Sequence, residues 1–340
     1  MASELDAAGN AFSRDPETRR FFSLLLVATA IPFVLFPLIA HAFPASAGWN
    51  DAKGFLLFVG SSGHVAASFF FYGDARMRDF MLGGHRGRFL VAPLTLIGLM
   101  GLAGLLFAEE RLLSYVILGY WVWQTHHYTR QNHGILAFVS RAAGVRASLR
   151  ESLAITLTGV AAVVGMITYV TPYQNTALDL YGWQLHTLAV ALYASAWVVY
   201  GITLFERNPL SAPWRSAVLL ALMLFYLPLF LFQDLLSAVF TYAIAHGLQY
   251  LVFMGVVAAV PTARRVRSYA LLAGVTLAGG AVLWLSQQQA FWGSYGKAVY
   301  GMGLGVVMWH FLLDAGVWRL SESFQRGYMA ERFSFLRSPR

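Results

Sequence analysis

The sequence predicts an all-α membrane protein, a polytopic helix bundle of about ten transmembrane helices with both termini in the cytoplasm. Hydrophobic residues make up 58% of the 340 residues and charged residues only 12%, and the mean hydropathy is +0.58. This composition is typical of polytopic membrane proteins. In addition, apolar runs of about 20 residues recur along the chain, and about 20 residues are needed to cross a hydrocarbon core.

Ten apolar runs are separated by turn or charge signals. Their approximate limits are 20–43, 54–74, 89–108, 112–140, 152–171, 181–204, 216–235, 237–260, 267–286 and 293–319. Only Phe232-Gln233-Asp234 separates the seventh run from the eighth, so a re-entrant hairpin is the alternative there. Pro228 predicts a kink in the seventh run, because proline cannot donate a backbone hydrogen bond.

Positive charge is concentrated in alternate connections between these runs. One face collects Arg14, Arg19, Arg20, Arg76, Arg78, Arg86, Arg88, Arg141, Arg146, Arg150, Arg207, Arg215, Arg264, Arg265, Arg267 and the tail arginines from Arg319 to Arg340. The opposite face has Lys53, Arg111 and Lys297. Since positively charged loops stay in the cytoplasm, we expect an integral protein of a bacterial inner (plasma) membrane, with both termini inside.

The net charge of +8 follows these loops and forms no stripe, so no nucleic-acid partner is expected. We find no repeat and no linker, and therefore predict one integral-membrane domain, 1–340. It would begin with a cytoplasmic segment, 1–19, and end with a basic cytoplasmic tail, 321–340. The start, Met1 to Arg20, lacks the apolar core of a signal peptide, so no cleavage is expected. Clustered glycines at 274–280 and 301–305 predict close helix packing.

The chain contains no cysteine. Thiolate metal sites, iron–sulfur clusters, disulfides and cysteine nucleophiles are therefore excluded. The remaining candidate metal ligands are His, Asp, Glu and Tyr side chains.

Histidines mark the interior of the predicted bundle. The stretch from Trp121 to Gly134 alone places three histidines, an arginine and three amides inside a predicted span, where such groups are costly unless they bind something. Seven histidines fall in even-numbered runs, namely His64, His126, His127, His133, His186, His246 and His310. Most of them lie at similar predicted depth, as a site between the helices of a bundle requires.

Helical spacing groups the polar residues of the fourth run into two faces. His126, Arg130 and His133 are four and seven residues apart and share one face, whereas His127 and Gln131 share the adjacent one. We expect His126 and His127 to lie at the depth of the site. The residues from Arg130 to His133 should lie toward its cytoplasmic edge.

Two other runs carry polar partners at the same spacing. His310 and Asp314 are four residues apart in the tenth run, and Asp314 is the only acid deep inside a predicted span. His246 is followed by Gln249 and Tyr250 in the eighth run. Asp314 could ligate beside His310 or orient its ring.

We predict the metal ligands to be His64, His126, His127, His133, His246, His310 and Asp314. Arg130, Gln131 and Tyr250 are the candidate catalytic residues, which could orient ligands or relay protons. His186 is expected to form an interhelical hydrogen bond. Several neutral imidazoles with one carboxylate favour a transition metal, most of all iron, in a mononuclear or dinuclear site; copper, zinc and haem are the alternatives.

In its buried histidines the chain resembles the histidine-rich integral-membrane non-haem iron oxygenases. These are the lipid desaturases and hydroxylases and the Brp/Blh-type carotenoid cleavage dioxygenases. The desaturase patterns HxxxH and HxxHH are absent, and the nearest feature is the pair His126-His127 followed by His133. Like Brp/Blh proteins, the chain carries scattered intramembrane histidines. The resemblance implies oxygen-dependent chemistry on a lipophilic substrate.

We therefore expect a membrane-embedded, metal-dependent oxidoreductase. Its partners would be membrane lipids, a lipophilic small-molecule substrate and an electron donor at the cytoplasmic face. Two other functions remain open. A haem clamped by paired histidines would make it an electron-transfer protein, and a chain of histidines could transport metal ions or protons.

Overall fold

The computed structural model describes residues 15–42, 58–106, 110–168, 181–207, 209, 212–232, 235–259 and 265–337. Every secondary-structure element in these ranges is helical, which confirms the all-α class. Some arginines and lysines used to predict topology, including Arg14, Lys53 and Arg264, lie outside the described residues.

The helices follow the predicted runs closely. They are α2 (Pro16–Ala42), η1 (Phe58–Gly63), α4 (His64–Ala67), α5 (Phe70–Gly73), α6 (Ala75–Gly84), η2 (Gly87–Val91), α7 (Ala92–Leu106), α8 (Glu110–Ala142), α9 (Leu149–Ile167), α10 (Gly182–Arg207), α11 (Pro213–Leu224), α12 (Pro228–Leu231), α13 (Leu235–Ala258), α14 (Arg265–Gly274), η6 (Val275–Gly279), α15 (Gly280–Ser286), η7 (Gln289–Tyr295), α16 (Gly296–Val317), α17 (Ser323–Ala330) and η8 (Ser334–Leu336).

Six helical segments in the described ranges are long and apolar enough to cross a membrane. They are Gly87–Leu106, Leu149–Ile167, Gly182–Arg207, Ala238–Ala258, Arg265–Ser286 and Phe291–Val317. This supports an integral membrane protein. The count of ten spans and the cytoplasmic location of both termini stay predictions.

Backbone contacts divide the chain into two compact units. Unit 1 comprises Met1–Ala42, Thr125–His246 and Met329–Arg340, and unit 2 comprises Phe43–Gln124 and Gly247–Tyr328. Three of the boundaries between the units fall inside continuous helices, α8, α13 and α17. Because no loop or linker marks these three boundaries, the composition of the sequence carries no sign of them.

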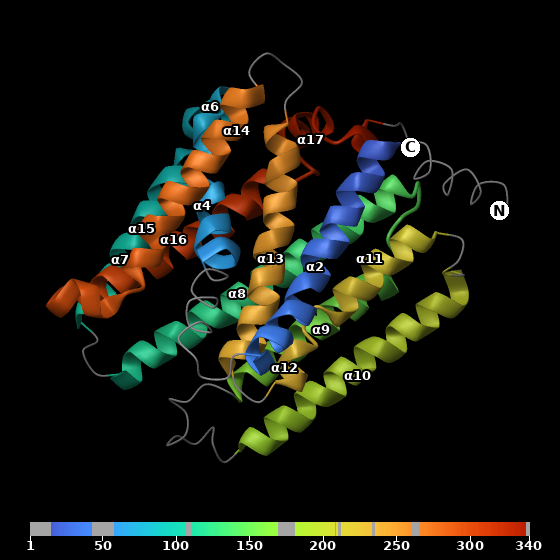
Figure 1. Cartoon of the computed structure of the whole chain (residues 1–340), viewed down its shortest axis with the longest axis horizontal. Helices are drawn as coiled ribbons and strands as arrows, with labels where there is room; N and C mark the ends of the chain where they lie inside the picture. The colour runs from blue at the N-terminus through green and yellow to red at the C-terminus, as the bar shows by residue number, and fades with distance from the viewer. Residues whose placement is uncertain are drawn as a thin grey trace. The chain divides into compact units, whose positions relative to one another are not determined.

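In unit 2, α7 and α16 lie side by side (Figure 1). Glycines at the contact let the two backbones approach. A Cβ atom on Gly301 would collide with the Met100 carbonyl oxygen, and one on Gly305 would lie 2.6 Å from the Cα atom of Ile97. The predicted packing role of these glycines is thus confirmed.

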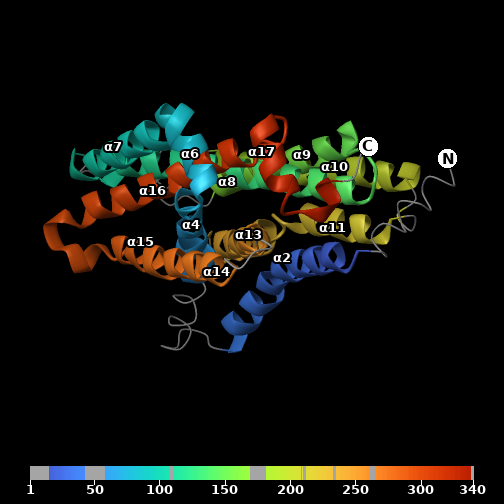
Figure 2. The ribbon, with the colours of Figure 1, turned by 90° about the horizontal axis from the view of Figure 1, so that it is seen from above.

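The segment α14–η6–α15, also in unit 2, forms one rod (Figure 2). It packs closely on η1 and α4, because a Cβ on Gly280 would lie 3.1 Å from the Cα of Gly63 and one on Gly279 would lie 3.0 Å from the Cβ of Ala66. Gly274, grouped with them from sequence, has open space beside it. The contact therefore needs only two of the three glycines.

In unit 1, α9 and α10 pack along each other (Figure 1). Helix α9 begins with a capping box, in which Ser148 and Glu151 each bond the other's backbone N–H. Glu151 is fully buried, and its other carboxylate oxygen lies 2.6 Å from Arg215 of α11. A single acid thus begins one helix and connects it to another.

Pro228 interrupts the seventh apolar run as predicted. Helix α11 ends at Leu224, three residues in turn conformation follow, and Pro228 occupies the first position of α12. Proline is suited to that position because the first N–H of a helix has no partner within it.

Two helices were not predicted from the sequence. Helix α6 lies in the basic segment that was expected to be a loop, and it begins where the Asp74 carboxylate accepts a bond from the Met77 N–H at 2.9 Å. Helix α17 lies in the basic tail and buries Tyr328 completely. Both are short, and neither shows the long apolar run on which the prediction relied.

Candidate functional site

Five buried polar residues gather in unit 2, and we call them the unit 2 cluster: His64, Ser68, Tyr250, His310 and Asp314. They come from α4 and its C-cap, from α13 and from α16. Each is at most 8% exposed. Because buried polar groups are costly unless they are bonded, so dense a group calls for mutual partners or a ligand.

The turn before His64 fixes the tautomer of its ring. His64 follows the π-helical turn η1, and its Nδ1 lies 2.6 Å from the carbonyl oxygen of Gly60. A carbonyl only accepts, so Nδ1 carries the hydrogen and Nε2 of the neutral ring carries the lone pair. Histidines that ligate metals are commonly held by such a bond from the other ring nitrogen.

Ser68 connects three helices through its hydroxyl group. Its Oγ lies 2.6 Å from Nδ1 of His310 and 2.9 Å from the hydroxyl of Tyr250. The Tyr250 hydroxyl in turn donates to Oδ1 of Asp314 at 2.9 Å.

The direction of each bond in this chain follows from the carboxylate. Tyr250 donates its single hydrogen to Oδ1 of Asp314, so Ser68 donates to Tyr250 and the His310 Nδ1–H donates to Ser68. The neutral His310 ring therefore carries its lone pair on Nε2. Trp318 also forms a hydrogen bond with Asp314.

The lone-pair nitrogen of His310 faces the second oxygen of the same carboxylate. Its Nε2 lies 3.6 Å from Oδ2 of Asp314, which is too long for a hydrogen bond. A transition-metal ion bonds imidazole nitrogen and carboxylate oxygen at about 2.0–2.2 Å, so an ion bound to both would hold them roughly 3–4 Å apart. This pair of atoms fits a shared metal ion.

His64 lies beside this pair. Its ring centroid is 5.1 Å from that of His310, and a ligand nitrogen of each lies within 4.8 Å of the other. The Tyr250 ring lies beside both, with its centroid 5.8 Å from that of His64 and 5.0 Å from that of His310. Buried histidine and aspartate side chains of unit 2 can therefore hold a metal ion.

The surroundings of His310 on α16 are apolar and aromatic. Phe311, the next residue, packs against Tyr120 and Trp123 of α8 at 6.3 and 5.7 Å between ring centroids. Trp309, on its other side, packs against Phe69 at 4.2 Å. The residues on either side of His310 are thus buried and aromatic.

Unit 1 holds a second buried group. The ring centroids of His127 and His246 are 5.0 Å apart, and those of Tyr128 and His246 are 4.0 Å apart. The Gln131 amide donates to the backbone oxygen of His246 at 3.3 Å. As predicted from their spacing, His127 and Gln131 face the same way, and both contact His246.

The other predicted face of α8 has different surroundings. His126 and Arg130 are exposed. His133 is half-buried, and its Nε2 lies 3.2 Å from the Thr156 hydroxyl of α9. None of these three joins His127 and His246 in the described contacts of unit 1. His186, predicted to have no role as a ligand, is exposed on α10.

Sequence reasoning missed Ser68 and the Gly60 carbonyl. Ser68 lies one turn after His64, so the i,i+4 spacing used for Asp314 would have placed it on the histidine's face. Serines are common in membrane helices, however, and nothing else in the sequence distinguishes this one. Comparison with models of protein families, with characterised proteins and with solved structures found no match to this chain.

Proposed function

We propose that this protein is a membrane-embedded, metal-dependent oxidoreductase, oxygen-dependent and most suited to iron, that acts on a lipophilic substrate. His64, His310 and Asp314 of unit 2 would ligate the metal. The observation that carries the proposal is the approach of His310 Nε2 to Asp314 Oδ2 at 3.6 Å inside a buried cluster.

The type of donor favours iron over the common hard cations. Two imidazoles with one carboxylate are a ligand set found in non-haem iron oxygenases, and three protein ligands leave positions for other molecules. Bound iron would supply oxygen activation beside an apolar substrate. Magnesium and calcium prefer oxygen ligands and would gain little from imidazoles.

The residues around the proposed metal have separable roles. The Gly60 carbonyl and Ser68 orient the rings of His64 and His310, and the orientation of ligands in this way typically raises metal affinity. Tyr250 holds a proton 2.9 Å from Asp314, where it can pass a proton to or from the carboxylate. Phe311, Trp309 and their neighbours keep the site dry.

The lipophilic class of the substrate rests on location. Candidate spans contribute Tyr250 and His310, and the rings around His310 are aromatic. A substrate reaching this depth of a bilayer must itself be apolar. His127, His246 and Gln131 of unit 1 are the further candidate ligands and orienting group, as predicted from sequence.

The test is elemental analysis of the purified full-length protein, together with its absorption spectrum. We expect bound iron without a Soret band, and oxygen consumption when a chemical reductant is added. His310→Ala and Asp314→Asn should lose most of the metal. His186→Ala removes an exposed histidine and serves as the matched control, with metal content unchanged.

Two results would overturn the proposal. One is a protein that holds no transition metal after growth in iron-rich medium and after reloading with Fe²⁺. The other is a Soret band, which would indicate haem and electron transfer. Equal loss of metal in His186→Ala and His310→Ala would show that the assay measures general misfolding.

Proton transport is the second candidate, and the hydroxyl chain favours it. Ser68 and Tyr250 connect His310 to Asp314 through successive hydrogen bonds, and buried chains of this kind carry protons in membrane transporters. The test is proton flux in liposomes: flux that disappears in Tyr250→Phe while iron is absent would favour transport over oxidation.

A further inference from the structure

A pocket of about 350 Å³ lies in unit 2, at the ends of two candidate spans. It is lined by aromatic rings from Phe80, Phe89 and Phe324, by basic groups from His85, Arg88 and Arg319, and by Gly316, Glu322, Ser323 and Gln325. None of these residues belongs to the unit 2 cluster, and the proposed oxidoreductase function assigns the pocket no role.

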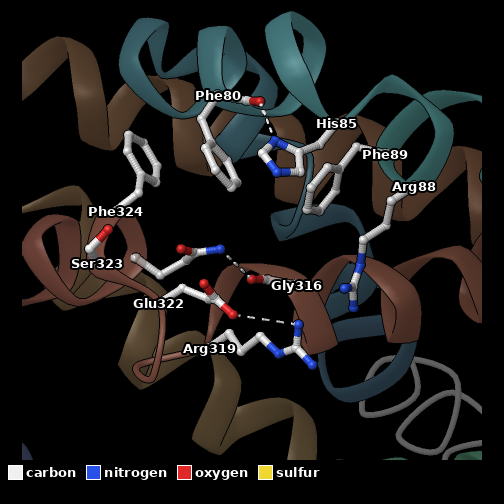
Figure 3. A pocket seen from close by; sticks show the side chains of 10 residues that line it. Phe80, His85, Arg88, Phe89, Gly316, Arg319, Glu322, Ser323 and Phe324 are labelled. Carbon is white, nitrogen blue, oxygen red and sulfur yellow. Dashed lines mark hydrogen bonds and ion pairs between the residues drawn. The ribbon is translucent and has the colours of Figure 1, made fainter.

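Two arginines face the pocket from different elements. Arg88 belongs to η2 and Arg319 follows α16; Figure 3 shows their guanidinium groups on the same side of the pocket, near the Gly316 backbone. Like charges repel, so a shared position is most stable when an anion lies between them.

The position of Arg88 is fixed by the end of α16. Its Nε and Nη2 donate to the Leu312 carbonyl oxygen at 3.4 and 3.3 Å. Gly316 is needed for this approach, because a Cβ there would lie 2.9 Å from Arg88 Nε and 2.6 Å from the Phe89 ring. A guanidinium held in this way loses less entropy when it binds a further ligand.

Glu322 is the acid among the lining residues, and it offsets only part of the positive charge of Arg88 and Arg319. Glu322 lies 3.8 Å from Arg319, with both side chains 57% exposed, and exposed pairs of this kind are weak. Arg88 and Arg319 together with Glu322 give the lining one net positive charge. Arg76 adds another nearby, over the Phe324 ring at 5.7 Å.

The pocket lies at the ends of two candidate spans, where lipid headgroups are expected. Arg88 is the second residue of the candidate span Gly87–Leu106, and Gly316 is the second-last residue of Phe291–Val317. The two spans lie side by side, and the arginine distribution predicts that these ends face the cytoplasm. The cytoplasmic leaflet carries anionic lipids.

The aromatic side of the pocket provides an apolar surface for the acyl portion of an amphiphilic ligand. Phe80 and Phe324 stack with centroids 4.2 Å apart, and the His85 ring lies 4.3 Å from Phe80. We propose that this pocket binds the phosphate of an anionic phospholipid between Arg88 and Arg319, with the glycerol and acyl portions against the phenylalanine rings.

The experiment follows the thermal unfolding of the detergent-purified full-length protein by tryptophan fluorescence. It is titrated separately with dihexanoyl phosphatidylglycerol, dihexanoyl phosphatidylcholine and sodium phosphate. We expect the anionic lipid to raise the unfolding temperature at the lowest concentration, and high salt to weaken the effect. An equal effect of sodium phosphate would overturn the lipid assignment, because the acyl chains would then contribute nothing.

Variants that remove a positive or a negative charge from the pocket test whether the lipid binds there. An arginine that contacts the lipid headgroup changes anionic-lipid affinity about fivefold, so Arg88→Gln with Arg319→Gln should raise the midpoint concentration roughly 25-fold. Glu322→Gln removes the competing carboxylate and should lower the midpoint. Arg78→Gln, an exposed arginine 3.9 Å from Asp79, is the matched control and should leave it unchanged.

Other results would also overturn the proposal: equal midpoints for both lipids, an unchanged midpoint in the double variant, or an equal shift in Arg78→Gln. If the double variant fails to fold, Glu322→Gln still decides the matter, because an exposed residue carries the change. A midpoint that rises or stays fixed in Glu322→Gln would contradict the assigned pocket.

Discussion

Ser68 Oγ lies 2.6 Å from Nδ1 of His310, although 242 positions separate the two residues in the chain. The same hydroxyl lies 2.9 Å from Tyr250. One serine thus positions an imidazole from α16 and a phenol from α13, and the carboxylate of Asp314 completes the arrangement.

Replacement of this serine tests its positioning role. Ser68→Ala should leave Tyr250 and His310 buried with one bond fewer, which costs about 1–3 kcal/mol of unfolding free energy. If His310 binds a metal, affinity should fall roughly 10–100-fold. Thermal unfolding and metal titration check the two effects, and Ser68→Thr, which keeps the hydroxyl, should restore part of both.

Ser195→Ala is the matched control for this experiment. Ser195 is exposed on α10, and its hydroxyl donates to the Ala191 carbonyl of its own helix at 2.8 Å. We expect little change in stability or metal binding. A metal affinity that is equal in Ser68→Ala and the native protein would contradict the positioning role.

Gly247 should resist substitution because of the Gly60 carbonyl. A Cβ at Gly247 would overlap that oxygen, which is the acceptor for His64. Gly247→Ala should therefore cost about 1–3 kcal/mol by overpacking and turn the His64 ring. Gly255→Ala, on the same helix with open space beside it, should be neutral or stabilise by up to about 1 kcal/mol. Comparable unfolding temperatures for the two variants would refute the close approach.

The buried ion pair of unit 1 should matter far more than an exposed one. Glu151→Gln leaves the Arg215 charge, whose side chain is 7% exposed, without its carboxylate, at a cost of about 3–5 kcal/mol. Glu206→Gln breaks the exposed pair with Arg150 and should cost less than about 1 kcal/mol. Denaturant unfolding compares them, and similar losses would argue against a buried pair.

Acid should weaken the contact between the two ends of unit 1. Burial alone would raise the pKa of Asp15, but hydrogen bonds from Thr18, Ser334 and the Glu17 N–H outweigh it and lower that pKa below 3.8. Because the folded pKa is depressed, the stabilisation is complete above pH 3.8 and disappears as pH falls through the folded value.

The matching variant is Asp15→Asn, which cannot titrate. Its stability should be lower than that of the native protein at pH 6, and the difference should shrink as the pH approaches 3. Asp79→Asn, which removes an exposed carboxylate on α6, should show no such convergence. If the stability difference between Asp15→Asn and the native protein stays constant between pH 6 and pH 3, the ionisation of Asp15 does not contribute to stability.

Much of the fold follows from local properties of the sequence. Apolar runs of span length predict each long helix, Pro228 predicts the break before α12, and Gly301 with Gly305 predicts a close helix contact. These features depend on residues within one or two turns, or on the transfer of one helix into lipid. For the same reason, His310 and Asp314 could be paired from their spacing alone.

The contacts between helices were decided only by the tertiary structure. The pattern of α8 gave two faces with histidines, and only packing against α13 directs His127 rather than His126 toward His246. Ser68 has no distinguishing neighbour in sequence, and its role comes from Tyr250 and His310 arriving from distant helices. Spacing determines which side chains share a face, whereas long-range packing determines what each face meets, so the sequence supplied the candidate residues and the fold decided which of them lie together.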